Sequence, residues 1–224
     1  MTENNKSRCK ALLTIYDHFA NWAKDFDFAC EKGCATCCTQ SVTMTTLEGE
    51  LIYDFIMTNK PELISLLENL PENSPAPATT TNQFAAACFS EKEVEHETAW
   101  DLSPCVFLRE NCCTIYPVRS FMCRSFGSRI RCEESGEAYV DPLFLTLNTI
   151  IMQCIEHLDQ GRPWGNMNTI LRSIANRKTN ASIQNTCSEL LAEPIPGFLI
   201  PPDEADKLHN QIKALLDIIT NSLQ

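Results

Sequence analysis

The stretch Cys30-Glu31-Lys32-Gly33-Cys34-Ala35-Thr36-Cys37-Cys38 places four cysteines within nine residues. These cysteines follow neither the three-to-four-residue spacing of a helix face nor the two-residue spacing of a strand face. Adjacent cysteines such as Cys37 and Cys38 are also hard to bridge by a disulfide without strain. Several soft donors in one short loop are typical of a metal ion or an iron–sulfur cluster. The stretch therefore predicts a metal site around which cysteine-rich loops and short strands fold.

The composition indicates an ordinary globular protein with an unusual number of thiols. The chain has 224 residues, of which 44% are hydrophobic and thirteen are cysteine. A chain of this length can build a core without disulfides, so the cysteines need another explanation. The segment 1–6 is polar, and no run reaches the roughly 18 apolar residues of a membrane helix. We therefore expect a cytoplasmic protein with reduced thiols and no membrane contact.

The charge of the chain bears on its partners. The formal net charge is −11 at pH 7, whereas non-specific nucleic-acid binding needs a basic surface. We therefore expect no nucleic-acid partner, and the sequence leaves an unknown protein partner open.

The apolar pattern predicts a mostly α fold with a helical C-terminal part. Apolar residues recur at three- and four-residue steps over several segments, and Thr45-x-x-Glu48 forms a capping box that opens one helix. Extended chain is expected at 41–44 and in the Pro-rich segment 194–202. Helices are expected at 7–28, after the capping box, from Pro61 to Leu70, at 84–98, from near Pro117, and at 142–160, 167–177, 182–192 and 203–223.

The domain organisation is predicted from shifts in composition. Residues 1–140 are expected to form a cysteine-cluster, metal-binding domain, and residues 141–224 a helical extension packed on it. The segment 71–82 is rich in Pro, Thr and Asn and predicts a flexible connection. We interpret it as an insertion loop, because cysteines that belong together lie on both sides of it.

A second group of cysteines lies downstream. It runs as Ser103-Pro104-Cys105-Val106-Phe107-Leu108, Cys113-Thr114-Ile115-Tyr116, Arg119 and Cys123-Arg124-Ser125-Phe126. Together with Cys34-x-x-Cys37-Cys38 upstream, these motifs resemble the CxxCxxCC family, the YkgJ-type zinc- or iron-chelating proteins, over roughly residues 30–130. Two positions depart from the family pattern: Ser120 stands where proline is usual, and Cys112 is an additional thiol.

The resemblance implies metal binding more firmly than it implies a reaction. It nominates seven ligands, namely Cys30, Cys34, Cys37, Cys38, Cys105, Cys113 and Cys123. Seven thiolates exceed one tetrahedral site, so one centre with four of them, two centres and a polynuclear centre all stay open. Arg119 and Arg124 could offset the charge of the centre, and Tyr116 could donate a hydrogen bond to a sulfur.

The identity of the metal and the role of the protein are less constrained. The irregular spacing at 105, 113 and 123 lacks a second zinc knuckle, so we favour an iron–sulfur cluster such as [4Fe–4S] over zinc. A protein that binds such a centre could act in redox chemistry or metal handling. Two alternatives are a cluster-dependent modifying enzyme that resembles the flagellin lysine methylases and a structural zinc adaptor. Whether the protein is an enzyme stays open, since no site for S-adenosylmethionine is recognisable.

The remaining cysteines and the histidines have simpler interpretations. Cys9, Cys154 and Cys187 lie in helical patterns and are expected in the core, because free cysteine is often buried. Cys88, Cys112 and Cys132 are undecided between ligands and ordinary thiols. The four histidines are dispersed and lie near no cysteine in the sequence, so none is expected to bind the metal.

Overall fold

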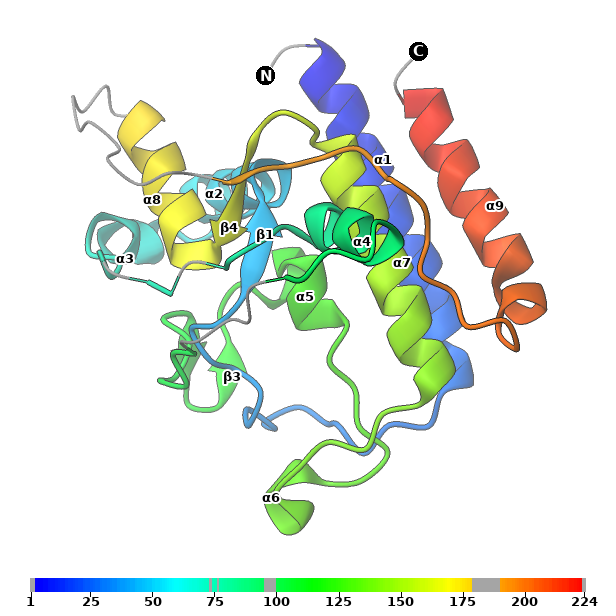
Figure 1. Ribbon diagram of the computed structural model, residues 1–224. Coiled ribbons are helices and arrows are strands. Elements are labelled where there is room, and N and C mark those ends of the chain that lie inside the picture. The colour runs from blue at the N-terminus through cyan, green and yellow to red at the C-terminus, as the bar shows by residue number, and fades with distance from the viewer. Residues whose placement is uncertain (1–2, 73, 76, 95–99, 179–189, 223–224) are drawn as a thin grey trace.

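The computed structural model describes residues 3–72, 74–75, 77–94, 100–178 and 190–222. As expected, it is mostly helical with short strands and a helical C-terminal part (Figure 1). The α-helices are α1 (Glu3–Trp22), α2 (Thr46–Asn59), α3 (Ile64–Glu68), α4 (Thr81–Phe89), α5 (Phe121–Arg124), α6 (Cys132–Ser135), α7 (Pro142–Leu158), α8 (Met167–Lys178) and α9 (Ala205–Ser222). Three short 3-10 helices are η1 (Ala23–Asp25), η2 (Pro61–Leu63) and η3 (Tyr116–Val118).

The strands form two small antiparallel sheets. The first has the order β1-β4-β5, with β1 (Thr43–Thr45), β4 (Pro163–Asn166) and β5 (Leu190–Leu191). The second is a hairpin of β2 (Leu108–Arg109) and β3 (Cys112–Cys113). Its two turn residues, Glu110 and Asn111, both have positive φ, at 49° and 57°. This left-handed geometry matches the twist of a two-residue hairpin turn, so the hairpin fixes the position of Cys113.

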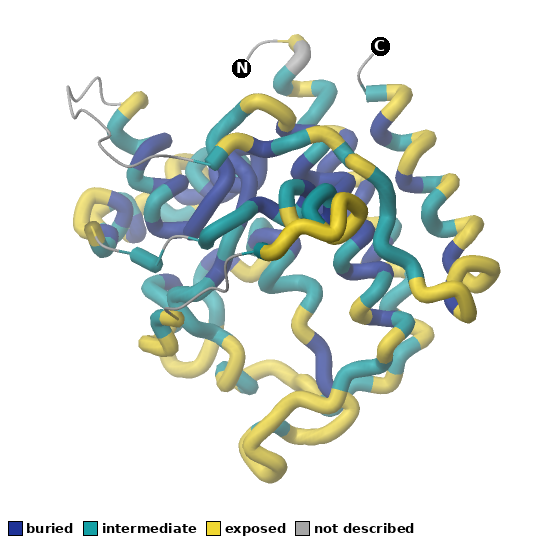
Figure 2. The backbone as a smooth tube through the Cα atoms, viewed as in Figure 1, coloured by how far each residue is buried: buried dark blue, intermediate teal, exposed yellow. Residues whose placement is uncertain are grey.

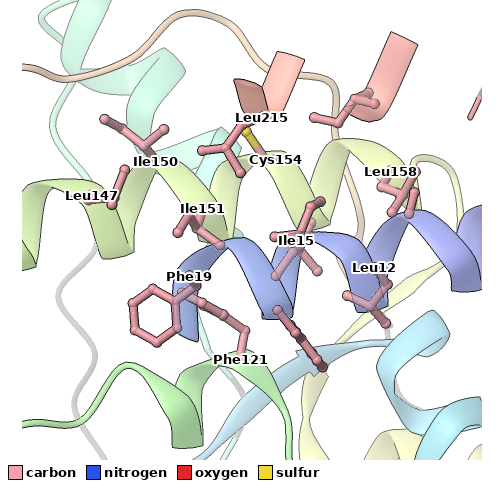
Figure 3. Close-up of a cluster of buried hydrophobic side chains, with 14 of the residues drawn as sticks. Leu12, Ile15, Phe19, Phe121, Leu147, Ile150, Ile151, Cys154, Leu158 and Leu215 are labelled. Carbon is pink, nitrogen blue, oxygen red and sulfur yellow. The ribbon is translucent and has the colours of Figure 1, made fainter. Parts of the chain in front are cut away.

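One hydrophobic core lies between α1, α7 and α9, which pack side by side (Figure 1). Leu12 and Ile15 from α1 meet Ile151 from α7 and Leu215 from α9 in its centre (Figure 3). Cys154 is fully buried among them, and Cys9 packs at the margin, as expected for core thiols. Cys187 lies outside the described residues. The helical C-terminal part thus packs directly on the N-terminal helix.

A second core lies between α2, α3 and α8, beside β1. Its buried centre includes Ile52, Phe107 and Ile170. Three cysteines of the downstream group, Cys105, Cys113 and Cys123, pack against its edge. The fold therefore brings the cysteine motifs to the border of an apolar cluster.

The carboxylate of Glu48 joins the two cores. The predicted capping box is present: Thr45 Oγ1 accepts from the Glu48 N–H, and the Thr45 N–H donates to Glu48 Oε2 at 2.9 Å. The other oxygen, Oε1, accepts from the Tyr16 hydroxyl at 2.8 Å and from the Phe121 N–H at 2.7 Å. One buried side chain therefore fixes α1, α2 and the start of α5 relative to one another.

Several predicted helices differ from the observed ones. The first helix ends at Trp22 rather than near 28, because Phe26 and Phe28 turn back to pack on Phe144. The helix expected at 84–98 begins at Thr81 and ends at Phe89, and residues 95–99 of that range are not described. Its first turn therefore takes the last two residues of the predicted loop 71–82.

The region after α8 also differs from expectation. Most of the helix predicted at 182–192 lies outside the described residues, and its described end is wrong, because residues 190–191 form β5. Leu190 pairs there with Trp164 of β4, a strand that the sequence did not predict. The segment from Pro61 to Leu70 forms a 3-10 turn followed by the short α3. None of the helices within the described ranges is long and apolar enough to cross a membrane.

Replacing Glu48 by Gln should destabilise the protein by about 3 kcal/mol, because a buried acceptor of several hydrogen bonds is lost. Chemical denaturation measures this free energy of unfolding. The matched control is Glu62→Gln, since the Glu62 side chain is 62% exposed and pairs with the exposed Lys60 at 3.5 Å. The control should change stability by less than about 0.5 kcal/mol. Equal effects of the two substitutions would contradict the central role of Glu48.

Asp159, which ends α7, predicts a pH dependence of stability. It is fully buried, accepts the Leu47 N–H at 2.8 Å and pairs with Arg162 at 3.0 Å. Burial raises the pKa of its carboxyl to about 6, although Arg162 opposes the shift. The raised pKa means that the native state binds this proton more tightly than the unfolded chain does. This stabilising contribution is present below about pH 4 and is lost as the pH rises through about 6.

Between pH 4 and pH 7 the wild type should therefore lose about 3 kcal/mol relative to Asp159→Asn, which cannot ionise. Urea unfolding of both proteins at the two pH values measures the difference. Parallel pH profiles of the two proteins would show that Asp159 does not titrate as proposed.

Candidate metal centre

Four cysteines from three chain segments converge at one edge of the second core. They are Cys38, Cys105, Cys113 and Cys123, named here the four-thiol cluster. In every pair among them, the negative charge of one thiolate acts to raise the pKa of the other. Coulomb interactions weaken with distance, so these effects place the four thiols in one neighbourhood. The fold thus joins the end of the first cysteine motif to three cysteines of the second.

Backbone hydrogen bonds hold the cluster together. Thr39 and Pro104 form an isolated antiparallel bridge, and the Cys105 N–H donates to the Cys38 carbonyl at 2.9 Å. Cys113 faces Leu108 across the β2–β3 hairpin. The two motifs, more than sixty residues apart in the sequence, are therefore tied side by side by main-chain contacts.

Cys123 is the most deeply placed thiol of the cluster. It lies on α5, whose first residue is held by the Glu48 carboxylate. Burial raises the pKa of Cys123 to about 12, and nearby thiolates add to the shift. The hydroxyl of Ser120, itself fully buried, donates to the Cys123 sulfur at 3.6 Å. Ser120, which departs from the family pattern in the sequence, therefore provides a hydrogen-bond donor to the Cys123 sulfur.

Cys37 stands next to the cluster without joining it. Its thiol donates a hydrogen bond to the Cys38 sulfur, which lowers the pKa of Cys38 and raises that of Cys37. Burial and the neighbouring thiolates oppose the lowering at Cys38. Cys38 therefore ionises more readily than Cys37. The thiolate is both the nucleophile and the metal ligand, so Cys38 is the better candidate for either role.

Arg119 is the predicted cation that lies beside the thiols. Burial raises the pKa of Cys113 and Cys123, and the positive charge of Arg119 partly opposes that rise. The guanidinium lies 3.9 Å from the ring centroid of Tyr116, which is 58% exposed. Arg119 Nε is buried and has no hydrogen-bond partner within the described part of the chain. An unsatisfied donor near Cys113 and Cys123 is a feature that a charged sulfur centre would satisfy.

The other arginines have different places. The Arg124 guanidinium lies 4.2 Å from the ring centroid of Tyr16, and its Nη2 donates to the Pro117 carbonyl at 2.7 Å. Its Nε also donates to the Arg119 carbonyl at 3.0 Å, so Arg124 ties the end of α5 back to the segment that precedes this helix. Burial raises the pKa of Cys105, and the positive charge of Arg109, which the sequence did not single out, partly opposes that rise. Only its place in the β2–β3 hairpin reveals this, because no motif in the sequence relates it to Cys105.

The remaining nominated thiols, Cys30 and Cys34, lie in a different place. They line an open cavity of about 210 Å³ together with Cys132, and this space is named here the cysteine cavity. Cys112, the neighbour of Cys113, is exposed on the other face of β3, and Cys88 is exposed on α4. The seven predicted ligands thus divide into the four-thiol cluster, the cavity pair Cys30 and Cys34, and Cys37 between them.

Within the described residues, no three Cys, His, Asp or Glu side chains are arranged so that they could hold a metal ion as they stand. Metal binding at either place therefore needs side-chain rotation to close the sulfurs around an ion. The donor type, the number of thiols and the orphaned Arg119 Nε fit a thiolate-bound centre.

Comparison with known proteins finds no relative: no family model, no curated protein and no solved structure matches this chain. The resemblance to the CxxCxxCC family therefore rests on the cysteine motifs alone.

In metal-free, reduced protein, Cys38 should react with iodoacetamide faster than Cys123, because its thiolate is the more populated form. Cys37→Ala removes the hydrogen bond that lowers the pKa of Cys38 and should slow alkylation at Cys38 several-fold near neutral pH. Peptide mass spectrometry after short reaction times measures both rates. Exposed Cys88 is the internal control, and its rate should be the same in both proteins. An unchanged rate at Cys38 would show that Cys37 does not tune it.

Proposed function

We propose that this protein binds a metal centre, an iron–sulfur cluster or alternatively zinc, through Cys38, Cys105, Cys113 and Cys123. The observation that carries the proposal is the convergence of these four thiols from three chain segments. Without a metal, burial keeps the thiols of Cys105, Cys113 and Cys123 protonated at neutral pH, because it raises their pKa values. A bound cation would stabilise the four thiolates together and release their protons.

The surrounding charges support a thiolate centre. Four thiolates around Zn²⁺ or a [4Fe–4S] core leave a net negative charge, which Arg119 and Arg109 would partly offset. Arg119 Nε and the Ser120 hydroxyl can donate to metal-bound sulfurs, and such hydrogen bonds tune the properties of a centre. Both residues are positioned by the same short segment that carries Cys123.

The two metals imply different roles. An iron–sulfur cluster would supply one-electron redox chemistry, whereas zinc would tie the cysteine loops to the core. The cysteines hold the group in either case, and the hairpin and α5 orient them. A role in redox chemistry or metal handling follows from the resemblance to the chelating family, and a modifying enzyme or a zinc adaptor stays a prediction of the sequence.

Anaerobic purification followed by analysis for iron, zinc and acid-labile sulfide tests the proposal. Wild-type protein should contain stoichiometric metal, with matched sulfide and visible absorbance if the centre is an iron–sulfur cluster. Cys113→Ser should lower the metal of this centre at least tenfold. Cys112→Ser is the matched control, because Cys112 is the adjacent residue of the same strand and is exposed.

Circular dichroism shows whether each variant keeps its helices. Metal content that is the same in wild type, Cys113→Ser and Cys112→Ser, with all three folded, would refute the assignment. Colourless protein with zinc alone would decide for the alternative metal.

A further inference from the structure

The cysteine cavity lies outside the four-thiol cluster. It is formed by residues 29–34, which follow the first helix, and by residues 130–133 at the start of α6. Figure 1 shows α6 at the lower end of the molecule, away from the β2–β3 hairpin. The backbone around α6 is largely exposed (Figure 2). The cavity therefore opens to solvent, whereas the four-thiol cluster lies against the core.

Specific contacts join the two walls of this cavity. The Ala29 N–H donates to the Ser128 carbonyl at 2.8 Å, and Arg131 forms an ion pair with Glu31. A turn places Cys34 in the cavity lining, and in this turn the Cys34 N–H donates to the Glu31 carbonyl at 3.0 Å. Gly33 within that turn has φ of 96°, a conformation that favours glycine. Specific contacts thus hold together the two walls of the cavity, which come from segments about a hundred residues apart.

Three thiols line the cavity, Cys30 and Cys34 on one wall and Cys132 on the other. Burial is the largest cause that raises the pKa of Cys30, and the thiolate charges of Cys34, Cys132 and, outside the cavity, Cys37 act in the same direction. The Ser128 backbone N–H donates to the Cys30 sulfur, and this hydrogen bond acts to lower the pKa of Cys30. Cys132 begins α6, a turn that ends where the Gly136 N–H donates to the Cys132 carbonyl at 2.9 Å.

We propose that Cys30, Cys34 and Cys132 form a second metal site, which binds a thiophilic divalent cation of the zinc class with one coordination position open to the cavity. Zinc sites with four protein ligands are closed and structural, whereas sites with three protein ligands keep a position for water or another ligand. The cavity volume of about 210 Å³ is several times the roughly 30 Å³ that a water occupies in the liquid. A small ligand therefore fits beside the ion.

The site goes beyond the proposed function, because it uses none of the four cluster thiols and assigns a ligand role to Cys132. Together the two sites use six of the seven nominated cysteines, and Cys37 belongs to neither. Cys30 and Cys34 belong with Cys132, and Cys38 belongs with the downstream cysteines. Residues of the first motif therefore serve two different sites.

Cobalt titration of the full-length, reduced and metal-free protein tests the inference. Co²⁺ replaces zinc, and its thiolate charge-transfer absorbance increases with the number of bound sulfurs. We expect the wild type to bind two equivalents. Imidazole should perturb the visible spectrum of only one of them, because only the cavity site has an open position.

Cys132→Ser and Cys30→Ser should each lose the imidazole-sensitive equivalent and keep the other. Cys113→Ser should show the reverse pattern, and exposed Cys112→Ser should bind like the wild type. Cys30 is exposed on a loop, so its substitution tests the site without disturbing the core. Circular dichroism confirms that each variant is folded.

The outcomes separate this inference from the proposed function. Unchanged cobalt binding in both Cys132→Ser and Cys30→Ser would overturn the cavity site and leave the four-thiol centre standing. Full binding in Cys113→Ser, together with loss of one equivalent in Cys132→Ser, would refute the four-thiol centre and support the cavity site. Loss of all cobalt in each of the three variants would show one shared centre and overturn the second site.

Discussion

The carboxylate of Glu48 is the interaction on which the arrangement of this protein depends. It is buried and accepts hydrogen bonds from Thr45, from the Tyr16 hydroxyl and from the Phe121 backbone. These donors belong to three helical regions that no sequence-local contact joins. A buried acceptor whose partners are lost costs several kcal/mol, so the position of α5 is strongly held. Because α5 carries Cys123, the core determines where the deepest thiol of the candidate centre lies.

The two groups of thiols differ in the environment that the fold gives them. The four-thiol cluster lies against apolar side chains and beside Arg119, an environment suited to a closed centre whose sulfurs accept hydrogen bonds. The cysteine cavity is open and is flanked by the ion pair of Arg131 with Glu31. Closed and open thiolate sites have different chemistry, since only the open site can exchange a ligand. One chain would thus hold two sites with separate roles.

Much of the helical framework could be predicted because it depends on local patterns. The Thr45 capping box and the apolar stripes of α1, α7 and α9 are visible as spacings in the sequence. Strand β4 could not be predicted, because four residues are too few for a periodic signal and its pairing with Thr43–Thr45 spans more than a hundred positions. The early end of α1 depends on Phe144, which is equally distant in the chain.

The sequence by itself determined that this is a mostly α protein and that its cysteines, crowded without helical or strand spacing, are candidate ligands. Which thiols share a site was decided only by tertiary structure. Neighbours in the chain such as Cys34 and Cys38 are separated, whereas Cys38 and Cys105 are tied by a backbone hydrogen bond. The physical reason is that side chains of a short loop point in several directions. Their grouping is then set by long-range packing against the hairpin, α5 and α6, and no spacing rule contains that packing.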